Sequence, residues 1–225
     1  MLRKRFGLAS AAVAFLLLTS GLRADDAEDR AVKAVEKLGG KVLRDENTPG
    51  KPVSRLYLND TKVTDNDLKD FKAFKNLQEL VLSDTAITDK GLMEIKDFQG
   101  LQRLRLPGTK VTDAGLLELK GLKKLEHLGL DNTKVTGTGL KELKDLKNLD
   151  SLTLSSTPMT NDGFKELTNL KSLKYLSLSN VKMTAEGLKV LKEMKSLRRL
   201  SLSGVSKESV AELQKALPKC DIQIL

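Results

Sequence analysis

The sequence contains no tryptophan, one cysteine and one histidine, and aromatic residues make up only 4% of its 225 residues. A single cysteine excludes an intramolecular disulfide framework and any metal site built from several cysteines, so Cys220 is expected to be a small apolar side chain. The scarcity of aromatic residues requires a core of leucine and other aliphatic side chains. No apolar stretch of membrane-spanning length follows residue 18.

The first 24 residues have the layout of a secretory signal peptide. Arg3, Lys4 and Arg5 form a basic start, residues 6–18 are an apolar run, and a short polar segment ends at Ala24. We therefore expect export to the periplasm or the extracellular space after cleavage near Ala24, with an uncleaved N-terminal anchor as the alternative. The whole chain has a formal net charge of +9, and the exported chain would have +5, because residues 1–24 contain four basic and no acidic residues.

Six units of 24 residues follow one another without a gap over residues 53–196. They share the pattern LxxLxLxxTx(V/I/M)TDxGLxxLxxLxx, whose positions are numbered here as places 1–24. A repeat of this period indicates stacked supersecondary units. Alternating apolar residues at places 4 and 6 predict a short strand, and the apolar period of three from place 16 predicts a helix. The units therefore predict an α/β solenoid with one parallel sheet.

The connecting residues fit this arrangement. Threonine at place 12 is expected to cap each helix, and aspartate at place 13 to lie in the first turn, where the helix dipole favours negative charge. Glycine at place 15 is expected to let neighbouring backbones approach closely. Residues 25–52, an amphipathic helix and a polar strand, are expected to cap the N-terminal end, and residues 197–225, a last partial repeat with a helix and a strand, the C-terminal end.

This pattern resembles that of leucine-rich repeat proteins. Its VTDxGL stretch is similar to the ribonuclease-inhibitor-like, cysteine-containing subclass, with threonine at place 9 in place of cysteine; Val181 and Val205 lack the hydroxyl there, which leaves hydrogen bonding at this place open near the C-terminus. With the signal peptide, the chain resembles exported bacterial proteins of this family. The resemblance implies a horseshoe with the sheet on its concave face and helices on its convex face, and protein binding as its usual role.

Outward-facing residues of the sheet form the candidate site. If places 4 and 6 face the core, places 3, 5 and 7 face outward, along a strip about 30 Å long. Arginine and tyrosine commonly anchor interfaces, and the candidate partner-binding residues are Tyr57, Glu79, Arg103, Arg105, His127, Tyr175 and Arg199. Alternatively, Arg55, Glu79 and Arg103 alternate in sign only to pair with one another. The serines and threonines beyond Ser151 equally fit an ordinary solvated sheet.

The sequence gives no indication of catalysis. His127 has no serine or cysteine nucleophile in an activating arrangement, and neither a phosphate-binding glycine loop nor an HExxH zinc motif occurs. We therefore predict no enzyme activity, no cofactor and no metal, with His127 as a surface residue. Export and the lack of aromatic residues among the basic ones argue against nucleic acid as a partner.

Two functional hypotheses remain. The leading one is a non-catalytic protein-binding module, expected to be monomeric, which recognises an unidentified protein through its concave face. The alternative uses the predicted convex face, whose outward helical places hold 15 lysines against 8 acidic residues. On this alternative, the protein is an envelope-associated structural protein that attaches electrostatically to an anionic polymer or membrane surface. An ordinary solvated face, with lysine and glutamate close together, also explains these lysines.

Overall fold

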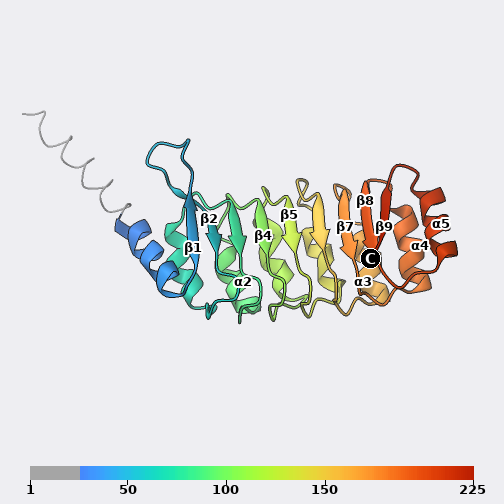
Figure 1. Cartoon of the computed structure of the whole chain (residues 1–225), viewed down its shortest axis with the longest axis horizontal. Coiled ribbons are helices and arrows are strands. Elements are labelled where there is room, and N and C mark those ends of the chain that lie inside the picture. The colour runs from blue at the N-terminus through green and yellow to red at the C-terminus, as the bar shows by residue number, and fades with distance from the viewer. Residues whose placement is uncertain (1–25) are drawn as a thin grey trace, which may run out of the picture.

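A computed structural model describes residues 26–225 (Figure 1). The predicted signal peptide lies outside these residues. In the described part, nine strands form a single sheet in chain order, and the helices lie along one side of it (Figure 1). The first pair of strands is antiparallel and every later pair is parallel. The fold is therefore the α/β repeat solenoid that the sequence predicts.

Short strands alternate with short helices along the whole array. The strands are β1 (Lys41–Arg44), β2 (Val53–Tyr57), β3 (Glu79–Val81), β4 (Arg103–Arg105), β5 (His127–Gly129), β6 (Ser151–Thr153), β7 (Tyr175–Leu178), β8 (Arg199–Leu202) and β9 (Asp221–Ile224). The connecting helices are η1 (Asp67–Ala73), α2 (Asp89–Ile95), η2 (Gly115–Gly121), η3 (Thr138–Leu143), α3 (Asn161–Leu167), α4 (Ala185–Glu193) and α5 (Lys207–Ala216). None of the helices within residues 26–225 has the length and apolar character needed to cross a membrane.

Three of the connecting helices, η1, η2 and η3, are 3-10 helices rather than α-helices. A 3-10 helix has three residues per turn, so side chains three positions apart lie directly above one another. The apolar period of three matches this geometry, and Leu116 and Leu119 of η2, with Leu122 just after it, are all fully buried. The sequence therefore predicts the buried face of these segments correctly without specifying their helix type.

The core lies between the sheet and the helices and is mainly leucine. In all seven units the side chains at places 1, 4 and 6 are at most 2% exposed. Just beyond each strand, the place-8 residue has a left-handed backbone, with φ between 52° at Asn132 and 68° at Gly108. Aspartate, asparagine and glycine, which occupy six of the seven positions, tolerate this conformation better than other residues. The turns thus direct each chain segment from the sheet toward the helical side.

Threonine at place 9 makes the same bond in each of the first five units. Its hydroxyl donates to the backbone carbonyl of the place-6 leucine, as Thr85 does to Leu82 at 2.7 Å. At Val181 only the backbone N–H reaches the equivalent carbonyl, at 3.3 Å from Leu178. The hydroxyl ladder therefore ends before the C-terminal units.

Threonine at place 12 caps only part of the helices. Thr88, Thr160 and Thr184 accept hydrogen bonds from backbone N–H groups at the starts of α2, α3 and α4, as expected. The prediction is wrong for η1 and η3, whose first residues receive no side-chain cap. There Thr64 and Thr136 instead donate their hydroxyls to aspartate carboxylates.

Aspartate at place 13 links each of the first three units to the next. The Asp89 carboxylate accepts from the backbone N–H of Thr112 at 2.8 Å and from its hydroxyl at 2.7 Å. Asp65 binds Thr88 in the same way, and Asp113 binds Thr136. We call these contacts the Asp–Thr clasps. They add a contact between repeats to the first-turn role predicted for these residues.

Both ends of the array are covered. A helix over residues 26–37 buries Val35 completely, and its Glu28 carboxylate accepts from Arg44 at 2.6 Å and from the backbone N–H of Val53 at 3.1 Å. The loop from β1 to β2 projects beyond the edge of the sheet (Figure 1). At the other end, α5 buries Leu213, and β9 continues the parallel sheet beside β8.

Candidate binding surface

The strand register brings the predicted outward-facing residues into rows on one face of the sheet, which we call the open sheet face. Place 3 runs from Arg55 through Glu79, Arg103, His127, Ser151 and Tyr175 to Arg199. Place 5 runs from Tyr57 through Val81, Arg105, Gly129, Thr153 and Ser177 to Ser201. All seven candidate residues therefore share this face.

The cluster of charges at its N-terminal half does not neutralise itself. Arg55, Glu79 and Arg103 are neighbours in register, yet the ion pairs found within residues 26–225 include none of them. The alternative that these three side chains pair with one another is therefore wrong. Arg103 and Arg105 are exposed, and their guanidinium groups remain available to a ligand.

Two adjoining hollows lie in the middle of the open sheet face. The first, of about 310 Å³, is bounded by Glu79, Arg103, Arg105, His127, Gly129 and Thr153 among others. The second, of about 350 Å³, includes His127, Thr153, Tyr175, Ser177 and Arg199. They share His127, Ser151 and Thr153. Together they form one shallow groove that runs across the strands from β3 to β8.

The C-terminal end of this groove holds a positive charge that is already partnered. The Arg199 guanidinium lies 5.8 Å from the centre of the Tyr175 ring, a cation–π distance. Its Nε is also 3.5 Å from the Asp221 carboxylate on β9. Tyr175 is 41% exposed. The pair therefore offers an aromatic surface and a guanidinium whose orientation is set by its neighbours.

His127 has carboxylates, not a nucleophile, near its nitrogens. Its Nδ1 lies 3.7 Å from Asp150 Oδ1 and its Nε2 lies 4.0 Å from Glu126 Oε2. Ser151 is its neighbour in register, and no hydrogen bond joins the two within the described residues. A serine nucleophile requires a base that accepts its proton directly, so this arrangement lacks that relay.

Two features of the open sheet face were not predicted from the repeat pattern. Gly129, on the central strand, leaves the space that the first hollow occupies. β1 also widens the face, because its antiparallel register sets Leu43 beside Arg55 and Lys41 beside Tyr57. Leu43 is 47% exposed. A glycine at an outward place of the pattern was the one available sequence signal for the hollow.

Lysines on the helical side are partly neutralised between repeats. Lys72 contacts Glu94 at 2.6 Å and Asp97 at 2.9 Å, and these carboxylates, Glu94 first, raise the pKa of Lys72 above its ordinary value. Lys96 similarly lies 3.4 Å from Glu118. In the middle of the array, a hollow of about 470 Å³ is lined by Lys120, Lys123, Lys141 and Lys144 together with Glu142 and Asp145. This hollow therefore holds more lysines than acidic residues.

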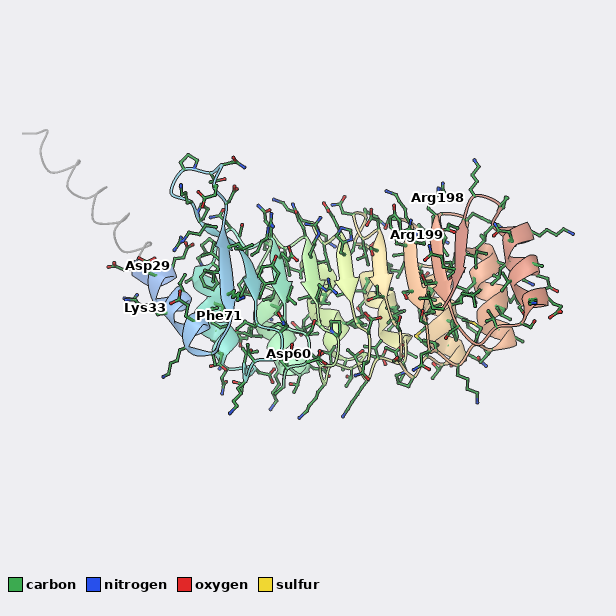
Figure 2. All side chains as sticks on the ribbon, in the orientation of Figure 1. Asp29, Lys33, Asp60, Phe71, Arg198 and Arg199 are labelled. Carbon is green, nitrogen blue, oxygen red and sulfur yellow. The ribbon has the colours of Figure 1, made fainter. Side chains whose placement is uncertain are left out.

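A larger hollow, of about 610 Å³, lies at the edge where β5 to β8 begin. Figure 2 shows Arg198 at this edge and Asp60 at the opposite one. The Arg198 guanidinium donates to backbone carbonyls of residues 195–197, and Lys174 lies 3.6 Å from Asp150. These cations already bind groups of the protein itself, unlike Arg103 and Arg105.

Comparisons with known proteins agree with this architecture. A family model described as "Leucine Rich repeat" matches residues 75–96. A leucine-rich repeat protein of Leptospira interrogans is 26% identical, with 69% of this chain and 45% of that chain covered and a TM-score of 0.53. No match was found among curated proteins. The chain therefore contains leucine-rich repeats and has their solenoid fold.

Two more distant structures share the fold alone. The first is the internalin InlF of Listeria monocytogenes, which is 18% identical; the match covers 87% of this chain and 62% of that chain, with a TM-score of 0.56. The second is the ectodomain of the Arabidopsis thaliana receptor kinase GASSHO1/SCHENGEN3, solved in complex with CASPARIAN STRIP INTEGRITY FACTOR 2. It is 18% identical, the match covers 82% of this chain and 25% of that chain, and the TM-score is 0.51. This chain spans less than two thirds of each of these three proteins.

Proposed function

We propose that this protein is a non-catalytic, monomeric protein-binding module that recognises its partner through the open sheet face. The observation that carries the proposal is the groove from β3 to β8. At one end it has Arg103 and Arg105, which form no ion pair within residues 26–225, and at the other a Tyr175–Arg199 pair. Arginine and tyrosine contribute strongly at interface centres. The receptor ectodomain solved with a bound factor supports the proposal by analogy of fold.

The proposed place of action is the cell envelope or the extracellular space. This rests on the layout of residues 1–24, with a basic start, an apolar run and a small residue at Ala24. N-terminal sequencing of the protein purified from fractionated cells of its source would test it. A mature chain that begins at Asp25 in the periplasm or medium supports export, whereas an intact N-terminus in the cytosolic fraction contradicts it.

Affinity capture from envelope and culture-fluid extracts tests the binding role. The bait is the chain of residues 25–225, compared with an Arg103→Glu/Arg105→Glu variant at low and high salt. The matched control is Lys110→Glu/Lys134→Glu, which changes net charge equally at two exposed positions outside the open sheet face. We expect one protein to be retained by the unchanged chain and by the control and lost by the arginine variant.

The lysines of the helical side provide the alternative role, attachment to an anionic polymer or membrane surface. The hollow lined by four lysines between η2 and η3 is the feature that favours it. Such attachment would weaken steeply as salt rises, since exposed charges are screened. Equal retention by the unchanged chain and the arginine variant, together with complete release by salt, would replace the proposed function with this alternative.

A further inference from the structure

The groove of the open sheet face has an uneven charge. Arg103 and Arg105 project from the same face of β4, because they are two residues apart in a strand, and no hydrogen bond or ion pair within the described residues involves their side chains. By contrast, Arg199 at the other end is 3.5 Å from Asp221. Two acidic side chains, Glu79 and Asp131, also line the first hollow. The Asp131 carboxylate is engaged, because it accepts from the Ser155 N–H at 2.8 Å and from the Thr153 hydroxyl. Glu79 lies in register beside Arg103 and is less exposed than the two arginines.

Gly129 creates room directly beside this positive charge. It lies in register between Arg105 and Thr153, so no side chain separates the guanidinium from the hollow. A Cβ atom at this position would lie 3.5 Å from Thr153 Oγ1 and farther from every other neighbour, which is ordinary contact. Packing therefore does not require glycine here. Glycine weakens a strand interior and often marks a close approach by a ligand.

The floor of the groove beyond Gly129 is neutral and rich in hydroxyl groups. Ser151, Thr153 and Ser177 line it, and the next cation is Arg199 on β8. A polymer with a regular row of phosphate or sulfate groups would need cations along the whole floor. A peptide needs them only where its acidic side chain lies, and hydroxyl groups can bond to its backbone elsewhere. From β4 to β8 the floor spans about 19 Å, the length of roughly six extended residues.

We infer that the ligand of this groove is an extended acidic peptide segment of the partner protein, with a carboxylate bound by Arg103 and Arg105 in the hollow at Gly129. The inference rests on the proposed function. Two guanidinium groups on one strand can hold a carboxylate through several charge-assisted hydrogen bonds. His127 lies at the same hollow, and the segment runs from there over the hydroxyl floor toward Tyr175 and Arg199.

Fluorescence anisotropy with labelled hexapeptides tests this directly. Hexaglutamate is the probe, and hexaserine and hexalysine are the reference peptides. We expect hexaglutamate to bind at least tenfold more tightly than hexaserine, and Arg105→Gln to weaken it at least tenfold. Lys110→Gln/Lys134→Gln, which removes twice as much charge outside the groove, is expected to change the affinity less than twofold.

Gly129→Val is the decisive variant, because it fills the hollow without changing any charge. The glycine backbone is not left-handed and a Cβ atom there makes only ordinary contacts, so circular dichroism and thermal melting should show a folded protein. We expect at least a tenfold loss of hexaglutamate affinity. Unchanged affinity in this variant would overturn the inference, and so would preferential binding of inorganic polyphosphate over hexaglutamate that is lost in Arg105→Gln.

The same reagents separate failure of this inference from failure of the proposed function. If a partner is captured through the open sheet face but excess hexaglutamate does not displace it, the acidic-peptide inference fails and the proposed function stands. The opposite result is that hexaglutamate affinity falls in Arg105→Gln and Gly129→Val as expected, but every captured protein is retained equally by Arg103→Glu/Arg105→Glu. In that case the peptide site stands and the proposed function fails.

Discussion

Glycine at place 15 sets how closely adjacent repeats approach. A Cβ atom built at Gly163 would collide with the backbone carbonyl of Thr136 in the preceding unit. Since backbone atoms cannot move aside as a flexible side chain does, we expect Gly163→Ala to lower the free energy of unfolding by about 1–3 kcal/mol, the usual cost of overpacking. Urea unfolding followed by circular dichroism measures this change.

Gly129→Ala is the matched control for that substitution. It is also a glycine-to-alanine change, but it lies where a Cβ makes only ordinary contacts. We expect an unchanged or slightly raised stability, by up to about 1 kcal/mol, because alanine restricts the unfolded chain. Equal destabilisation by the two substitutions would contradict the role of this contact between repeats, because alanine is favoured over glycine in both helices and strands.

The single cysteine gives a second prediction at the residue scale. Cys220 is 4% exposed, and burial, followed by the charge of Asp221, raises the pKa of its thiol. The reactive thiolate is therefore scarce in the folded protein at neutral pH. We expect slow reaction with Ellman's reagent in the folded state and rapid reaction in guanidinium chloride. Fast labelling of the folded protein would contradict the burial of this residue.

The raised thiol pKa of Cys220 also makes the stability of the fold depend on pH. The folded state favours the protonated thiol, so its contribution is present below the ordinary thiol pKa and is lost as pH rises into the alkaline range, where the unfolded chain ionises first. We expect Cys220→Ala to reduce this alkaline loss of stability. Urea unfolding at neutral and alkaline pH compares the two proteins, and an identical pH dependence would contradict the expectation.

At the scale of single elements, the Asp–Thr clasps couple one helix start to the next. Asp89 accepts two hydrogen bonds from Thr112 in the following unit. Asp89→Ala removes both and leaves a partly buried hydroxyl and N–H without this partner. Hydrogen bonds to charged groups contribute about 1.5–3 kcal/mol, so we expect a loss of stability in this range in urea unfolding.

Asp162→Ala is the control for the clasp. Asp162 also lies in the first turn of a helix, but its partner is Lys165 of the same helix and the pair is exposed. Exposed pairs contribute little, so we expect this variant to differ from the unchanged protein by at most about 0.5 kcal/mol. A similar loss in both variants would indicate a helix-dipole effect rather than a clasp.

The elements also show what the sequence could predict. The strands, their register and the buried face of each helix follow from apolar periodicity, because every unit repeats the same places. The Asp–Thr clasps do not follow, since the 24-residue spacing does not reveal how closely Asp89 and Thr112 approach once units stack. The left-handed turns could have been inferred from aspartate, asparagine and glycine at place 8. The hollow at Gly129 required the strand register as well as the glycine.

At the scale of the whole molecule, two series of hydrogen bonds end before the C-terminal units: the Asp–Thr clasps between repeats and the place-9 threonine bonds within them. The Asp–Thr clasps end at Asp113, because the next unit has Gly137 instead of aspartate at place 13. The Thr160 N–H therefore has no such carboxylate and donates to the backbone carbonyl of Thr136 at 3.0 Å. The place-9 hydroxyl bond ends at Thr157. Stability in a solenoid is approximately a sum over units and their neighbours, so these losses are not shared evenly along the array.

We therefore expect the C-terminal units to open at a lower free energy than the N-terminal ones. β3 and β7 are a fair comparison, because each is the third strand from an end of the sheet. Hydrogen–deuterium exchange should show amides of β7 exchanging at least tenfold faster than those of β3, which corresponds to about 1.4 kcal/mol. Asp89→Ala should narrow this difference by accelerating exchange at β3 and β4. Equal protection of β3 and β7 would show that the two hydrogen-bond ladders do not govern opening.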